Sequence, residues 1–227
     1  MTVSKEDEDV PDGLRERKKQ RTREHIATTA RQLFAERGFE RVTVAEIARE
    51  AEVAEKTVFN YFPTKEDLFY SRLESFEEEL LGAIRERDAG RTVVDAFAEF
   101  LLRPRGVLAR RASDDRDAAL EELRTITRVI TESPALLARE QRVFERYTAS
   151  LAALLAEETG ARAHDVEPRV VANALIGVHR ASIDDVRRRV LAGEDDLERL
   201  ARDLRAQTRR AIRRLESGLG SYGRRAR

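Results

Sequence analysis

The chain has 227 residues, 43 Lys+Arg and 43 Asp+Glu, so it is long enough for a large core, and its net charge of 0 still allows local charged patches. It contains no Cys, which excludes disulfide bonds and thiolate metal sites. No apolar run approaches the roughly 18–20 residues of a membrane-spanning helix. Residues 1–13 are acidic and lack the apolar core of a signal peptide. We therefore expect a cytoplasmic protein that has no membrane partner.

Long stretches rich in Ala, Leu, Arg and Glu predict an all-α fold. Residues 1–13 are expected to be disordered. A helix follows, in which Ile26, Ala30 and Phe34 recur at helical spacing and Gly38 is a natural C-cap. Its first turns are basic, and this basic face is either merely solvated or an arm that faces phosphates. The basic residues are Arg15, Arg17, Lys18, Lys19, Arg21 and Arg23.

The stretch VTVAEIAREAEVAEKTVFNYFPTK, residues 42–65, predicts a helix-turn-helix. Thr43 and Glu46 form a capping box at the start of one short helix. After a tight turn at 52–54, a second short helix runs from about 55 to 62, because Pro63 ends it. A similar box at 64–67 begins a long helix, from about 64 to 87, that joins two domains. We expect a head at 14–63 and a larger helical body at 64–217.

The remainder of the body is predicted to consist of further helices, followed by a loose tail at 218–227. No element is assigned to residues 103–116, which include Pro104 and Gly106. The expected helices span about 91–102, 117–131, 134–159, 166–191 and 194–216.

The second short helix carries the candidate binding residues. Val58 and Phe62 are four residues apart and can form its inner face, which leaves its other side chains turned outward. Asn pairs with adenine, Lys donates to guanine, an aromatic edge contacts a thymine methyl, and hydroxyl groups suit phosphates. Helix starts, where free N–H groups converge, also favour phosphate. The candidate DNA-binding residues are Thr43, Lys56, Thr57, Phe59, Asn60, Tyr61 and Lys65.

Residues from about Arg23 to Phe69 resemble the N-terminal domain of the TetR family of transcriptional repressors, in the order and spacing of the residues named above and of Val53, Glu66-Asp67 and Leu68. The resemblance implies an all-helical homodimer, a three-helix DNA-binding head and a ligand-binding, dimerising body. It also implies a phosphate contact for Lys65 and backbone contacts for Thr43, Thr57 and Tyr61. Ala54 departs from the Ser or Thr common in the family, and Phe59 from Tyr. Whether Glu55 reads a base stays open.

Two sets of residues are predicted for the body. The apolar stripes on the last two helices predict a dimer interface, and the alternative is that they pack inside one protomer. The interface would comprise Val171, Leu175, Val178, Leu197, Leu204, Thr208, Ala211 and Leu215. The middle helices are predicted to form a pocket for a partly apolar organic effector, and the alternative is that the same residues are ordinary core. The pocket would be lined by Phe97, Leu101, Ile126, Ile130, Phe144, Tyr147, Asn173, Ile176 and His179.

An enzyme is not expected, because His25, His164 and His179 lie on different elements and no Gly-rich phosphate loop is present. No metal or cofactor is expected either. The function predicted is a ligand-responsive repressor that binds a palindromic operator as a homodimer and is released by a small molecule. The alternatives are an activator or architectural DNA binder with the same head, and a helical adaptor that binds protein.

Overall fold

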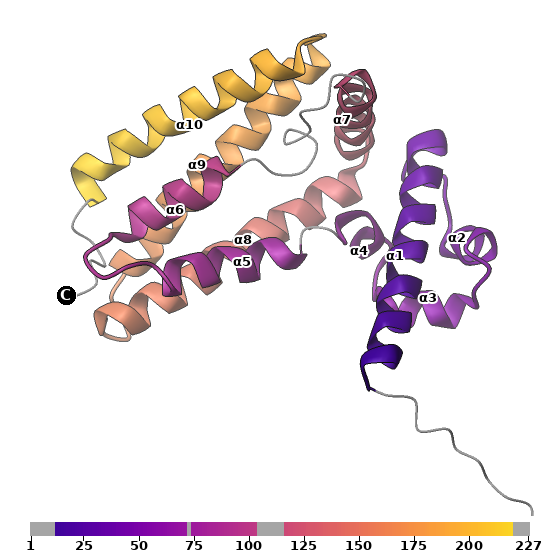
Figure 1. Cartoon of the computed structure of the whole chain (residues 1–227), viewed down its shortest axis with the longest axis horizontal. Coiled ribbons are helices and arrows are strands. Elements are labelled where there is room, and N and C mark those ends of the chain that lie inside the picture. The colour runs from indigo at the N-terminus through magenta and orange to yellow at the C-terminus, as the bar shows by residue number, and fades with distance from the viewer. Residues whose placement is uncertain (1–11, 72–73, 104–115, 220–227) are drawn as a thin grey trace, which may run out of the picture. The chain divides into compact units, whose positions relative to one another are not determined.

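The computed structural model describes residues 12–71, 74–103 and 116–219, and all the regular structure within these ranges is helical, which confirms the all-α prediction (Figure 1). No helix in these ranges is long and apolar enough to cross a membrane. The helices are α1 (Asp12–Arg37), α2 (Val44–Glu50), α3 (Glu55–Tyr61), α4 (Lys65–Tyr70), α5 (Glu74–Arg85), α6 (Val93–Leu102), α7 (Arg116–Thr131), α8 (Pro134–Thr159), α9 (Glu167–Leu191) and α10 (Leu197–Leu219).

Several predicted boundaries differ from the structure. The helix α1 already begins at Asp12, so residues 12 and 13 are helical and not disordered. In place of one helix over 64–87, α4 ends at Tyr70 and α5 begins at Glu74. The helix α10 spans Leu197–Leu219 in place of about 194–216, so residues 218 and 219, expected in the tail, are helical. The predictions for residues 1–11, 104–115 and 220–227 lie outside the described residues.

The chain divides into two compact units, Met1–Ser71 and Arg72–Arg227. The division falls after α4, whereas the sequence analysis placed it after Pro63. The physical reason is that α4 packs against α1. Leu68 of α4 is fully buried, and Arg31 of α1 donates a hydrogen bond to the Ser71 hydroxyl at 3.3 Å. The short α4 therefore belongs to the first unit.

Two helices of the first unit, α2 and α4, begin at side-chain caps. Thr43 and Glu46 form the predicted capping box at α2, and Thr64 and Asp67 form another at α4. At the other end of α1, Gly38 has φ +80, and its N–H donates to the Phe34 carbonyl at 2.9 Å. This left-handed position favours glycine and turns the chain sharply after α1. The buried faces of α1, α2 and α3 then pack together.

The second unit is built around α9, which packs against α6, α7, α8 and α10 (Figure 1). Its main core joins five helices and includes Leu80, Phe97, Leu151, Leu175 and Ile212. The predicted span of α8, 134–159, agrees with the structure. The Ser133 hydroxyl accepts the Leu136 N–H at 3.2 Å at its start, and Gly160 ends it in the left-handed region.

Four of the eight residues predicted for the dimer interface are already buried within one protomer. Val171, Leu175, Leu197 and Thr208 are buried in the chain by itself. The Thr208 hydroxyl also lies 3.1 Å from that of Ser182, which joins α10 to α9. The other members, Val178, Leu204, Ala211 and Leu215, are partly buried. The Ser182–Thr208 contact shows that part of the stripe that suggested a dimer seam serves the packing of α10 on α9.

The turn between α9 and α10 contains Glu194, whose carboxylate is surrounded by hydrogen-bond donors. Its side chain accepts hydrogen bonds from Arg199 at 2.6 Å and Arg189 at 2.5 Å, and from the backbone N–H of Asp196 at 3.2 Å. These donors, Arg199 first and Arg189 second, lower the pKa of Glu194 to about 2. The charged carboxylate is therefore favoured by folding.

This arrangement predicts a loss of stability in acid. Because the folded pKa lies below the ordinary value of 4.5, the contribution of Glu194 is fully present above about pH 4.5 and disappears as the pH falls toward 2. We expect Glu194→Gln to have a lower melting temperature than the wild type at pH 7, with the difference shrinking below pH 4.5. Thermal unfolding of both proteins across pH 2–7 measures this difference in melting temperature. A difference that stays constant with pH would contradict the prediction.

Candidate functional site

The helix α3 presents one buried and one exposed face, as the sequence predicted. Val58 and Phe62 are buried, at 0% and 1% exposure, and the Arg23 guanidinium of α1 lies 5.0 Å from the centre of the Phe62 ring. Ala54 caps α3 without a side-chain hydrogen bond, which agrees with the absence of Ser or Thr there. Packing of this inner face fixes which side chains of α3 point away from the unit.

The candidate residues of α3 lie on its outer side. Lys56, Phe59 and Asn60 are exposed, with 46% of the large apolar Phe59 open to solvent, and Thr57 and Tyr61 are partly exposed. The side chains of Lys56, Thr57, Asn60 and Tyr61 form no hydrogen bond or ion pair with other residues of the described ranges. Their donors and acceptors are therefore available to an external partner.

Thr43 stands at the start of α2 and is already held in place. Its hydroxyl donates to Glu46 at 2.9 Å and accepts the Glu46 N–H at 3.2 Å. Glu46 also receives the Thr43 N–H at 2.8 Å and lies 3.6 Å from Arg37. These bonds, those from Thr43 first, lower the pKa of Glu46. The exposed helix start is thus ordered without a ligand.

Lys65 begins α4 and is half-buried. Its ammonium nitrogen lies 4.2 Å from the centre of the Phe39 ring. Burial lowers the pKa of Lys65, while the charges of Glu40, Glu66 and Glu46 act to raise it. No local pattern in the sequence indicates that the ring of Phe39 lies beneath this lysine.

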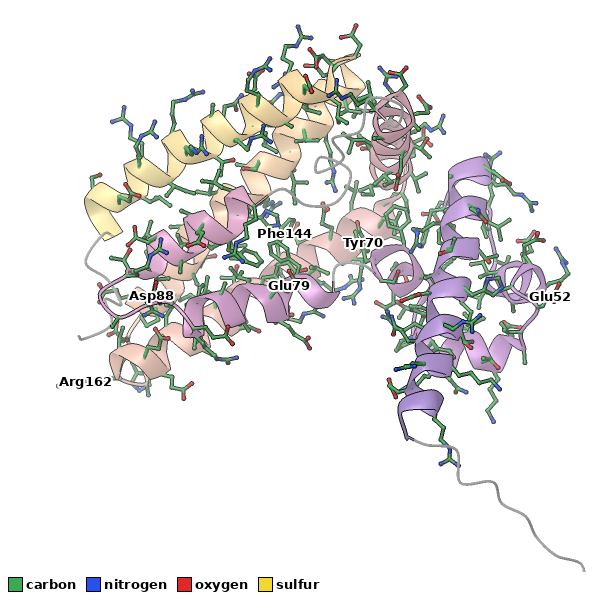
Figure 2. All side chains as sticks on the ribbon, viewed as in Figure 1. Glu52, Tyr70, Glu79, Asp88, Phe144 and Arg162 are labelled. Carbon is green, nitrogen blue, oxygen red and sulfur yellow. The ribbon has the colours of Figure 1, made fainter. Side chains whose placement is uncertain are left out.

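The turn between α2 and α3 contains a strained residue that the sequence analysis also missed. Figure 2 shows Glu52 projecting from this turn, and its φ of +53 lies in the left-handed region that favours glycine. Other L-residues pay roughly 1–2 kcal/mol in this conformation. A tight turn between two short helices was the only signal in the sequence that could have suggested it.

We expect Glu52→Gly to raise the free energy of unfolding by about 0.5–1 kcal/mol, since relief of strain exceeds the extra entropy of an unfolded glycine. Denaturant unfolding measures the change. Glu50→Gly is the control, because Glu50 is exposed and helical and its replacement should destabilise the protein. Equal losses for the two variants would contradict the strain at Glu52.

In the second unit, part of the predicted effector pocket comes together as an aromatic cluster. The ring of Phe76 stacks on His179 at 4.5 Å between centroids and on Tyr147 at 5.2 Å. Phe144, labelled in Figure 2, approaches His179 edge-on at 5.9 Å. Burial raises the pKa of Tyr147 to about 12, so its phenol is neutral at physiological pH. Phe76, at the centre of the cluster, was missing from the prediction.

The remaining pocket candidates do not all join this cluster. Phe97, Leu101 and Ile176 belong to the same core, but Ile126 and Ile130 of α7 are not among its described members. Asn173 is a correction: it is exposed and donates to the Arg169 carbonyl of its own helix at 2.8 Å. It therefore cannot line an internal pocket. No group of side chains in the described ranges is suited to hold a metal ion.

Residues 26–71 match the model of bacterial regulatory proteins of the tetR family. Residues 105–220 match that of the MftR C-terminal domain. The regulator TcmR of Streptomyces glaucescens is 31% identical over 195 residues, which cover 83% of this chain and 82% of TcmR. The chain belongs to the TetR family. It is a DNA-binding transcriptional regulator, and its family and relatives are regulators, not enzymes.

Further comparisons agree with membership of the TetR family. MftR of Mycobacterium tuberculosis is 28% identical over 162 residues, which cover 71% of this chain and 78% of MftR. The solved structure of NalD, the secondary repressor of the MexAB-OprM multidrug efflux pump in Pseudomonas aeruginosa, aligns with a TM-score of 0.50 at 20% identity. That alignment covers 86% of this chain and 97% of NalD, and it shows a shared fold.

Proposed function

We propose that this TetR-family regulator is a cytoplasmic, ligand-responsive repressor that binds a palindromic operator as a homodimer. The proposal rests on the outer face of α3. Phe59, Asn60 and the unpaired Lys56 are exposed there, and the buried inner face of the helix fixes their direction. A recognition helix of this kind enters the major groove with its side chains toward base edges. Repression follows from occupation of the operator.

The roles within the head divide by chemistry. Asn60, Lys56 and Phe59 are exposed side chains that can read adenine, guanine and a thymine methyl. Thr57, Tyr61, Thr43 and Lys65 supply hydroxyl groups, helix starts and an ammonium group to the phosphates, which position the protein without reading sequence. The exposed basic first turns of α1 add positive charge to the same unit.

Asn60→Ala and Lys65→Ala are expected to affect binding differently. Loss of Lys65 should weaken binding to every duplex and reduce the salt slope by about 0.9, since one phosphate contact disappears. Loss of Asn60 should relax preference at one operator position at a cost of about 1–3 kcal/mol for the preferred base. Binding titrations across a salt series and site selection with both variants measure this. An unchanged slope for Lys65→Ala, or an unchanged selected site for Asn60→Ala, would contradict the assignment.

For the homodimer we propose the exposed stripe of α9 in place of the buried residues predicted from sequence. Val170 and Leu191 are exposed large apolar side chains, and Gly177 and Ala181 between them are exposed and small, which favours close helix approach. Two such stripes related by a twofold axis form a self-complementary contact. The dimer would place two α3 helices in successive major grooves, roughly 34–36 Å apart or farther.

The charge on α10 supports this choice of face. Its outer side is a run of arginines that form no ion pair with other described residues: Arg202, Arg205, Arg209, Arg210, Arg213 and Arg214. If this side faced its copy across a twofold axis, like charges would meet and oppose association. We therefore assign the dimer contact to α9 and leave the arginine face of α10 outside it.

The effector is proposed to bind in the body near the cluster of Phe76, Phe144, Tyr147 and His179, where aromatic rings are combined with a few polar atoms. A partly apolar organic molecule fits such surroundings. It would bind more tightly to a dimer whose heads are mis-spaced, and so lower operator affinity by a coupling free energy of typically about 1–3 kcal/mol.

Selection from a random duplex pool with the purified protein tests the proposal, followed by binding of the selected duplex across a salt series. A palindromic sequence bound with a steep salt slope is the expected result. Failure to enrich any palindrome would overturn the operator-binding dimer. Release of the selected duplex by a small organic molecule then distinguishes a sensor from a constitutive binder.

A further inference from the structure

The start of α4 carries an arrangement that DNA binding by the head does not by itself explain. The Lys65 ammonium nitrogen lies 4.2 Å from the centre of the Phe39 ring and 5.9 Å from that of Phe34. The two rings are 4.9 Å apart, tilted by 47°, and both are buried, at 3% and 0% exposure. A cation thus rests on a fixed aromatic surface that comes from a different part of the chain.

The surface under the lysine is rigid because several contacts hold it. The turn at Gly38 directs Phe39 back against Phe34. Phe69 of α4 closes the group from another side, with its ring 6.5 Å from Phe39 and nearly perpendicular to it. The negative face of an aromatic ring attracts an ammonium group within about 6 Å, and more strongly when water is partly excluded. Lys65 is half-buried, so both conditions hold.

We propose that Phe39 is a positioning residue for DNA binding, which holds the Lys65 ammonium at the start of α4 before DNA arrives. A free lysine loses much of its rotamer freedom when it contacts a phosphate. A lysine that already rests on a ring has lost part of that freedom, so the phosphate contact forms at a smaller entropic cost. The inference rests on the proposed phosphate contact of Lys65 and adds the reason for its geometry.

A double-mutant cycle tests the coupling between the two residues. Phe39→Leu is expected to weaken binding of the selected duplex about threefold to tenfold with an unchanged salt slope, because the charge is still present. Lys65→Met should lower both the affinity and the slope. In the Lys65→Met background, Phe39→Leu should have no further effect on affinity. Equal effects of Phe39→Leu in both backgrounds would overturn the proposal and leave Phe39 with a structural role alone.

Two further variants separate positioning from folding. Phe69→Leu is the matched control, because its ring contacts Phe34 and Phe39 but no cation of the described residues lies over it. Any effect of this substitution should therefore be the same with and without Lys65. Pentafluorophenylalanine at position 39 keeps an aromatic ring but reverses the charge of its face. It should reproduce the loss seen with Phe39→Leu. Wild-type affinity with the fluorinated ring would overturn the proposal.

A measurement without DNA distinguishes this inference from the proposed function. In the free protein, the ε-methylene protons of Lys65 should resonate upfield of ordinary lysine values because of the Phe39 ring, and the shift should vanish in Phe39→Leu. An ordinary resonance position in the wild type would overturn the positioning role. If instead the upfield shift is present but Lys65→Met binds DNA like the wild type, the phosphate contact of the proposed function fails, and the role of Phe39 in DNA binding fails with it.

Discussion

Replacing Gly177 with Gln is expected to convert the dimer to monomers and to lower affinity for a palindromic duplex by about 100-fold or more. Gly177 is exposed on α9, and a Cβ added there meets no atom within 4 Å in the described part of the chain, apart from its neighbours and the backbone of its own helix. The larger side chain therefore disturbs nothing inside one chain but blocks close approach of two α9 helices. Without the dimer, the second head no longer binds as part of the same complex, which typically removes about 10²–10⁴-fold of avidity.

The same substitution should leave the protomer folded, and this makes the result interpretable. Glycine in the middle of a helix costs roughly 1 kcal/mol relative to good helix formers, so Gln at 177 favours the helix itself. Gly82→Gln is the matched control, since Gly82 is also helical with no atom within 4 Å of an added Cβ, but lies on α5.

Sedimentation and duplex binding measure both effects of Gly177→Gln. A monomeric Gly177→Gln beside a dimeric Gly82→Gln is the expected pair of results. If Gly177→Gln remains dimeric, the α9 stripe is not the interface.

Replacing Glu158 with Gln is expected to destabilise the body by about 2–3 kcal/mol, because it leaves a buried guanidinium without its counter-ion. The Arg87 side chain is only 3% exposed and donates two hydrogen bonds to the Glu158 carboxylate of α8, at 2.7 and 3.0 Å. It also donates to the carbonyls of Ile84 and Arg91, at 2.6 and 3.3 Å. One side chain thus fixes the segment between α5 and α6 to the end of α8.

Denaturant unfolding of Glu158→Gln measures this loss, and Glu99→Gln serves as the control. Glu99 also bonds two arginines, Arg91 at 2.6 Å and Arg103 at 2.8 Å, but all three side chains are well exposed. Exposed ion pairs contribute little, so the unfolding midpoint of Glu99→Gln should stay close to that of the wild type. Similar unfolding midpoints for the two variants would show that the buried ion pair of Arg87 contributes no more to stability than the exposed ion pairs of Glu99.

The candidate DNA-binding face could be predicted well because its signals are local. The capping box of Thr43 with Glu46 and the four-residue spacing of Val58 and Phe62 involve neighbours within one or two turns. Such patterns determine where a short helix begins and which side it buries. The outward direction of Asn60 and Phe59 follows once the inner face is known. Their contacts with DNA stay predictions.

The body was predicted less well, because the periodicity of apolar residues shows which face of a helix is buried but not which helix packs against that face. Leu175 and Thr208 lie on regular stripes, which suit a dimer seam and internal packing equally. Only the packed structure shows that both residues are buried within one protomer. Asn173 was misplaced for a related reason: a rotation of about 100° about the axis of α9, one residue along the helix, separates the buried Ala172 from the exposed Asn173.

The sequence by itself determined the all-α class, the helix-turn-helix, the exact limits of α8 and the membership that the TetR-like motif indicated, because each depends on residues close together in the chain. The tertiary structure alone decided that Phe39 lies under Lys65, that Arg87 reaches Glu158 and that one stripe of α9 is left uncovered. These features join residues far apart in sequence. They follow from how the helices pack, and no local pattern encodes that packing.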